Sequence, residues 1–160
     1  MLFRSPGYPI YESQIEFHGG VGLPYGFLPG RNNFGLDLEA LRRGVTPRTK
    51  LLIVNDLQNP TGAESSPEEL AAIAEFAVRH DLTVLCDEAY FDIRYRGKSR
   101  SLASFPGMEE RCVLLYTFSK KYAMTGWRLG AAAGPREIID VIAKLRSEEH
   151  TSELQSRQVI

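Results

Sequence analysis

Lys120 stands among side chains that could bind an aldehyde and a phosphate group together. Thr117 and Ser119 place two hydroxyl groups just before it, and Arg128 follows it in the same stretch. A lysine amine can form a Schiff base with a carbonyl carbon, and a guanidinium can bind two phosphate oxygens at once. This combination predicts a site for a small phosphorylated aldehyde.

Three polar side chains further upstream could complete the same site. Asp87 offers a carboxylate, while the side chains of Asn59 and Tyr90 can both donate hydrogen bonds. Taken singly, each residue has an ordinary alternative: Asn59-Pro60-Thr61-Gly62 is a good turn, Asp87 could be a turn aspartate, and Lys120 could be a solvated surface lysine. Taken together, they are the groups that pyridoxal phosphate (PLP) needs from a protein.

Three segments carry a resemblance to a known family. Asn59-Pro60-Thr61-Gly62, Asp87-Glu88-Ala89-Tyr90 and the stretch 117–130 resemble the class I and II aminotransferases, which are PLP enzymes of fold type I. The intervals also match the pattern of that family, with 28 residues from Asn59 to Asp87 and three from Asp87 to Tyr90. The resemblance covers about residues 6–145.

Lys120 is the residue that the resemblance assigns to catalysis. In this family the Schiff-base lysine lies eight residues before a phosphate-binding arginine, and that interval leads from Arg128 to Lys120 rather than to Lys121. The resemblance further implies that the amine of Lys120 moves the substrate Cα proton to the cofactor. The cofactor-binding set that it implies is Asn59, Asp87, Tyr90, Thr117, Ser119, Lys120 and Arg128. Glu88 is expected to be structural and Trp127 to pack in the core.

Short apolar runs alternate with helix signals, which favours an α/β fold. Continuous apolar runs predict strands buried on both faces at residues 50–55, 82–86, 111–117 and 128–133, with a looser candidate at 21–27. Helices are expected at residues 10–17, 36–43 and 67–80 and from 134 onward; the third has the start signal Ser66, Pro67 and Glu69. We therefore expect a three-layer structure, a mostly parallel sheet flanked by helices, as a partial fold type I large domain. In such sheets ligands bind beyond the carboxyl ends of the strands, where the site residues fall.

The composition is that of an ordinary soluble domain. The chain has 160 residues, a net charge of −1, 43% hydrophobic and 24% charged residues, so nothing indicates a nucleic-acid surface. No apolar run approaches the length of a membrane span. Cys86 and Cys112 lack metal-ligand spacing, so we expect buried thiols and no metal site. A cytoplasmic location is the default expectation.

The C-terminal end differs in character from the rest. Residues 146–156 resemble the in-frame translation of a common sequencing adapter. We therefore expect 1–145 to be a partial PLP-binding large domain and 146–160 to be a non-native tail, with a polar helical tail as the alternative. The upstream phosphate loop and ring-stacking aromatic residue of such an enzyme, and its downstream carboxylate-binding domain, are expected outside this chain. We expect the 160 residues alone to have little or no transaminase activity.

The resemblance implies PLP-dependent transfer of an amino group between an amino acid and a 2-oxo acid, by an enzyme that is a homodimer when complete. No nucleic acid or membrane partner is expected. Another fold type I PLP enzyme, such as a carbon–sulfur lyase or a decarboxylase, is one alternative, because the cofactor withdraws electrons in all of them. An aminotransferase-like effector domain of a transcriptional regulator is a second alternative, which would require a DNA-binding domain upstream.

Overall fold

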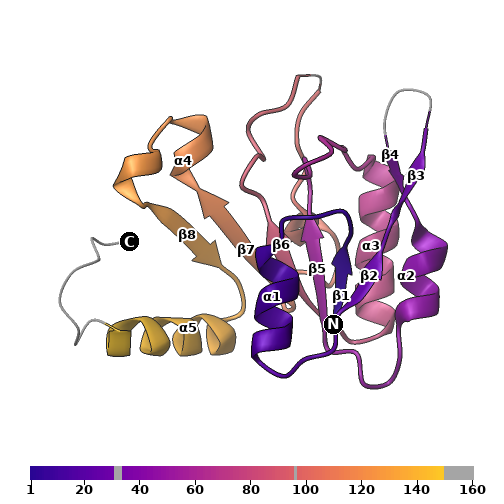
Figure 1. The fold of residues 1–160 in the computed structure, drawn as a ribbon, viewed down its shortest axis with the longest axis horizontal. Coiled ribbons are helices and arrows are strands. Elements are labelled where there is room, and N and C mark those ends of the chain that lie inside the picture. Colours follow the sequence, from indigo (N-terminus) through magenta and orange to yellow (C-terminus); the bar gives the residue numbers. More distant parts are fainter. Residues whose placement is uncertain (31–33, 96, 150–160) are drawn as a thin grey trace.

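A six-stranded sheet forms the centre of the molecule (Figure 1), in a computed structural model that describes residues 1–30, 34–95 and 97–149. The strand order is β2-β1-β5-β6-β7-β8, and only the β7–β8 pair is antiparallel. The strands are β1 (Leu2–Arg4), β2 (Leu23–Tyr25), β5 (Leu51–Asn55), β6 (Thr83–Asp87), β7 (Cys112–Thr117) and β8 (Gly130–Ala133). The predicted mostly parallel sheet is confirmed.

Helices cover both faces of this sheet. The described helices are α1 (Ile10–Phe17), α2 (Leu38–Gly44), α3 (Pro67–Arg79), α4 (Phe118–Lys121) and α5 (Arg136–Glu149), with short 3₁₀ helices η1 (Leu102–Ser104) and η2 (Thr125–Trp127), and α1, α2 and α3 pack on the sheet. Successive strand residues point to opposite faces. Leu52 accordingly packs with Leu41 of α2 and Ile73 of α3, whereas Ile53 packs with Ile15 of α1. These two apolar clusters give the three layers that the sequence predicts.

The helix α3 illustrates how the sequence determines the local structure. Ser66 accepts a hydrogen bond from the Glu69 amide, and the Glu69 carboxylate accepts one from the Ser66 amide, while Pro67 occupies the first turn. This capping box satisfies amides that the first turn leaves unpaired. The helix then buries one apolar face against the sheet: Leu70, Ile73, Ala74, Phe76 and Ala77.

Replacing Ser66 with alanine is expected to destabilise the chain by about 0.5–2 kcal/mol, because the Glu69 amide loses its partner. Urea unfolding followed by circular dichroism measures this change. Ser13→Ala is the matched control: the Ser13 hydroxyl donates to the Pro9 carbonyl on exposed α1 and caps no amide, so a shift within about 0.5 kcal/mol is expected. Equal stability losses in the two variants would contradict the capping role.

Several short elements were not predicted from the sequence, namely β1, β4 (Phe34–Leu36), α4, η1 and η2. β1 is only three residues long but lies between β2 and β5 with all its side chains buried. The candidate strand at 21–27 is divided into β2 and β3 (Phe27–Pro29), and β3 pairs with β4 in a separate antiparallel sheet.

At the C-terminal end, helix α5 continues to Glu149, past the predicted boundary at residue 145. Residues 150–160 of the predicted tail lie outside the described residues.

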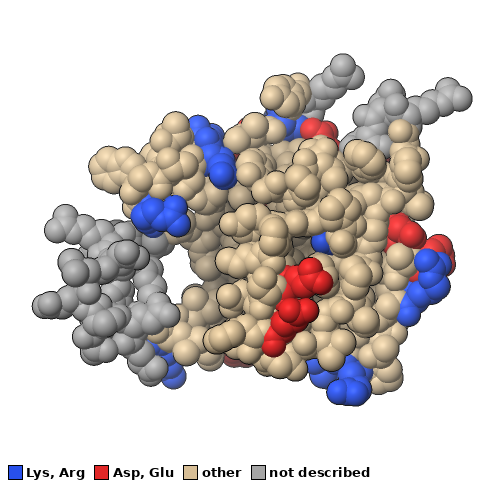
Figure 2. Space-filling view, viewed as in Figure 1, with Lys and Arg blue, Asp and Glu red and all other residues tan. Residues whose placement is uncertain are grey.

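Charged side chains are scattered over the face of the molecule that Figure 2 shows. Red atoms gather over α1, where Glu12 and Glu16 are exposed, and blue atoms lie near α4; neither sign covers this face. Among the described residues, no helix is long and apolar enough to cross a bilayer.

Candidate functional site

All seven predicted site residues line one cavity of about 290 Å³. They come from three places that are far apart in the sequence but adjacent in the sheet, namely the carboxyl ends of β5, β6 and β7 and the segments that follow them. The residues are Asn59, Asp87, Tyr90, Thr117, Ser119, Lys120 and Arg128, with Tyr8, Ala89 and Thr125 completing the lining. The cavity volume is close to the lower end of the range for small-molecule sites, about 300–1,000 Å³.

The carboxylate of Asp87 is held from two sides. Asp87 is the last residue of β6 and pairs in register with Asn55 of β5. The Ala89 amide donates to its Oδ1 at 3.0 Å, and the Tyr11 hydroxyl donates to its Oδ2. Burial, followed by the bond to Asp87, raises the pKa of Tyr11 well above its ordinary value, so this hydroxyl remains a donor. The carboxylate is therefore fixed and still has lone pairs for a ligand.

Glu88 faces away from the cavity, as predicted for a structural residue. Burial raises the pKa of its carboxyl above the ordinary 4.5 and outweighs Ser101 and the backbone of Leu102, which lower it. Because the pKa of Glu88 is higher in the folded state, there is a pH range in which its carboxyl is protonated in the folded chain but ionised in the unfolded chain. The contribution of Glu88 to the free energy of unfolding is therefore fully present below pH 4.5, and it is lost as the pH rises through the folded-state pKa.

We expect Glu88→Gln to gain stability relative to the unmodified chain as the pH increases from 4 to 7, because glutamine has no proton to lose. Urea unfolding of both proteins at pH 4 and pH 7 gives the four free energies needed. A stability difference that is the same at the two pH values would contradict this assignment.

The structure separates Lys120 from its neighbour Lys121. The Lys120 amine lies over the ring of Tyr90, 5.5 Å from its centroid, and the side chain lines the cavity. The Lys121 amine instead pairs with Asp92 at 3.1 Å, and Asp92 also accepts a hydrogen bond from Tyr116. Lys120 is thus the lysine with access to a ligand in the cavity.

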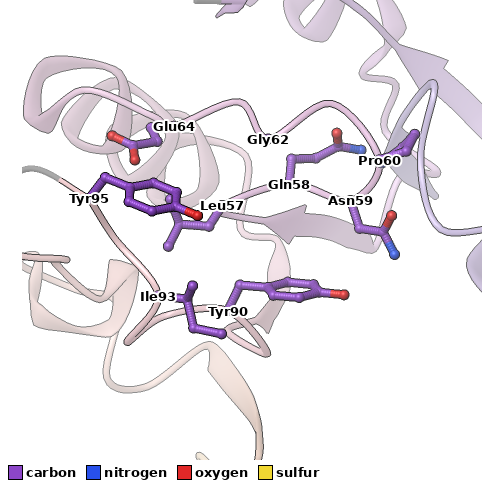
Figure 3. A pocket seen from close by; sticks show the side chains of 9 residues that line it. All are labelled: Leu57, Gln58, Asn59, Pro60, Gly62, Glu64, Tyr90, Ile93 and Tyr95. Carbon is purple, nitrogen blue, oxygen red and sulfur yellow. The ribbon is translucent and has the colours of Figure 1, made fainter. Parts of the chain in front are cut away.

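Asn59 and Tyr90 direct their polar ends to the same side. Figure 3 shows the Asn59 carboxamide and the Tyr90 hydroxyl side by side, pointing away from Tyr95 and Glu64. Both residues also line the second cavity shown there, of about 300 Å³, whose far end carries Glu64 in an ion pair with Arg94. Two donors aimed at one point could bind a single oxygen atom.

Arg128 adopts a strained backbone conformation at the cavity. Its φ of 52° lies in the left-handed region, which costs a residue other than glycine about 1–3 kcal/mol and is frequent in functional sites. Its guanidinium donates one hydrogen bond, to the Thr125 carbonyl at 3.3 Å. Thr117 accepts from the Ser119 amide at 3.2 Å and so orders the turn that presents Ser119. A cation and two hydroxyl groups therefore line the same cavity.

Three polar residues at this site were not predicted from the sequence, and one prediction for a residue outside the cavity is wrong. Tyr8 and Thr125 line the cavity, and Tyr11 holds Asp87. The segment Pro6-Gly7-Tyr8-Pro9 was the signal available for Tyr8, whereas Tyr11 is 76 residues from its partner. The prediction for Trp127 is wrong: its side chain is 74% exposed on η2.

The residues present fit PLP. The cavity offers an amine, a carboxylate, an amide beside a phenol, and a guanidinium with hydroxyls, which match an aldehyde, a ring nitrogen, a phenolic oxygen and a phosphate. The exposed ring of Tyr8 adds an aromatic surface at the same cavity. Within the described ranges of the chain, no cluster of three or more His, Cys, Asp or Glu side chains is placed to hold a metal ion.

Comparison with known proteins points to the same chemistry. A family model described as aminotransferase class I and II matches residues 1–159. The chain is 41% identical over 140 residues to a probable N-succinyldiaminopimelate aminotransferase of Mycobacterium tuberculosis, covering 87% of this chain and 35% of that protein. It is 41% identical over 154 residues to the aspartate/prephenate aminotransferase of Thermus thermophilus, covering 95% and 39%.

Solved structures resemble this fold closely. Thermus thermophilus aspartate aminotransferase with maleate superposes with a TM-score of 0.87 at 39% identity, over 94% of this chain and 39% of that one. The Mycobacterium tuberculosis N-succinyldiaminopimelate aminotransferase gives 0.84 at 41% identity, over 87% and 36%. The chain therefore spans less than two fifths of the length of each of these relatives.

Proposed function

The chain belongs to the class I and II aminotransferase family, and on that premise we propose that its cavity is the PLP site of an enzyme that transfers an amino group between an amino acid and a 2-oxo acid. The observation that carries this proposal is the convergence of seven side chains from three strand ends on one cavity. Enzymes of this family depend on PLP.

Each side chain has a distinct task in this proposal. When bound, PLP supplies an electron sink for the bond that breaks at the substrate Cα. Lys120 holds the aldehyde carbon of the cofactor and later moves a proton at the substrate Cα. Asp87, fixed by Tyr11 and the Ala89 amide, stabilises a protonated ring nitrogen.

The remaining residues orient the cofactor. Asn59 and Tyr90 donate to the phenolic oxygen, and their joint bonds stabilise its negative charge. Arg128 neutralises the phosphate, with Thr117 and Ser119 as hydroxyl donors. The strained backbone of Arg128 and its location beside Thr117 support this assignment.

The relatives favour transamination over the alternatives. The proteins compared above are named as aminotransferases, whereas a lyase, a decarboxylase or a regulator would share the cofactor residues without that reaction. The test uses the complete protein that contains this chain, incubated with PLP, amino donors and 2-oxo acids. Formation of a new amino acid and a new 2-oxo acid is expected; release of sulfide, ammonia or carbon dioxide instead would reject the proposal.

Three wider statements are part of the proposal. We propose that the complete protein is a cytoplasmic homodimer and that residues 146–160 are a non-native tail. Exposed apolar side chains on the flank that carries η2 and α5 support an interface there: Trp127, Val141, Ile142 and Leu145. Sedimentation of the complete protein tests the dimer. Sequencing of the genomic locus tests the tail, because a native reading frame that encodes residues 146–160 would refute a non-native origin.

A further inference from the structure

Asn55 connects two site residues that are 28 positions apart in the sequence. It is the last residue of β5, and its side chain is buried, with the residue 5% exposed. Its Nδ2 donates to the Asp87 carbonyl at 3.0 Å, and its Oδ1 accepts from the Asn59 amide at 3.0 Å. One carboxamide thus joins the backbone of Asp87 to that of Asn59.

Asn55 is itself held in place by a buried arginine. The Arg4 guanidinium donates to the Asn55 carbonyl at 3.1 Å and to the Ser65 hydroxyl at 3.0 Å. Arg4 is 5% exposed and lies against the aromatic rings of Tyr25 and Phe27. Buried hydrogen-bond networks of this kind fix a geometry, because breaking one member leaves polar groups unpaired.

We infer that Asn55 is a positioning residue that sets the spacing between Asp87 and Asn59 across the cofactor cavity. The inference rests on the proposed function, in which Asp87 binds the ring nitrogen and Asn59 the phenolic oxygen of one rigid aromatic ring. Because the ring cannot adjust, the protein must keep its two partners at a constant separation. A neutral carboxamide suits this task, since it donates and accepts at once.

Three variants of the complete protein that contains this chain distinguish a positioning role from a general contribution to stability. Asn55→Ala removes both hydrogen bonds. Asn55→Asp retains an acceptor for the Asn59 amide but has no donor for the Asp87 carbonyl. Thr49→Val is the matched control: Thr49 is also buried, and its hydroxyl accepts from the Thr46 amide, remote from the cavity.

Two properties are measured on each PLP-loaded protein: the dissociation constant of the cofactor and the pH midpoint of its visible absorbance change. Asn55→Ala is expected to weaken cofactor binding about ten-fold or more. It is also expected to raise the pH midpoint, because a displaced Asn59 stabilises the phenolic oxygen less. Asn55→Asp, which retains one of the two hydrogen bonds, is expected to weaken binding as well. Thr49→Val is expected to change neither property.

The possible results distinguish the positioning role of Asn55 from the proposed function. Asn55 variants that fold and match Thr49→Val in both properties would overturn the positioning role alone. Loss of the fold in both Asn55 variants would assign Asn55 to stability and also overturn it. Absence of any visible band or covalent cofactor in the unmodified complete protein would overturn the proposed function together with this inference.

Discussion

The Lys120→Ala variant is expected to lose the visible absorbance of covalently bound PLP completely, whereas Lys121→Ala is expected to keep it. The two lysines are adjacent, but only the Lys120 side chain lines the cavity, with its amine over the ring of Tyr90. The Lys121 amine is engaged by Asp92. Alanine at position 120 has no amine, so the cofactor can bind only non-covalently.

Absorbance spectra of the purified variants after incubation with PLP and dialysis give the result. Circular dichroism of the same samples shows whether each variant is folded. Covalent binding that survives in Lys120→Ala and disappears in Lys121→Ala would reverse the assignment of the two residues, and survival in both would place the cofactor elsewhere.

Replacing Asp87 with asparagine is expected to weaken PLP binding by about 10- to 100-fold, because a hydrogen bond to a charged group contributes about 1.5–3 kcal/mol. The change preserves the size of the side chain but removes its charge. Tyr11 and the Ala89 amide are placed to support a carboxylate, since both donate to it. Titration with PLP, followed by absorbance, measures the affinity.

Glu88→Gln is the matched control for Asp87→Asn. It makes the same chemical change at the next residue, whose carboxylate faces Ser101 rather than the cavity. Its PLP affinity is expected to equal that of the unmodified chain. Equal losses of affinity in the two variants would show that charge in this region matters in general and that Asp87 has no specific role.

The elements that carry the site follow from local sequence signals. The capping residues Ser66 and Glu69 define the start of α3, and continuous apolar runs define β5, β6 and β7. Because parallel strands end at the same edge of a sheet, the residues after those runs were expected to meet. The structure brings all seven of them to one cavity.

The features that the sequence does not predict depend mostly on contacts between residues that are far apart in the chain. The three residues of β1 are too few to show a period, and only pairing with β2 and β5 makes them a central strand. Tyr11 reaches Asp87 through the packing of α1 against the sheet, which no local pattern encodes. The exposure of Trp127 depends on which elements lie over η2, and an apolar residue type alone cannot predict that.

Borohydride reduction of the complete PLP-treated protein that contains this chain, followed by peptide mass spectrometry, tests the central claim most directly. Reduction makes the bond between lysine and cofactor permanent, so that the modified residue carries the added mass of the phosphopyridoxyl group. We predict that this mass is found on Lys120, in the cavity that Asp87 and Arg128 share. Modification of Lys121 or of other lysines without preference, or no modification at all, would contradict the account.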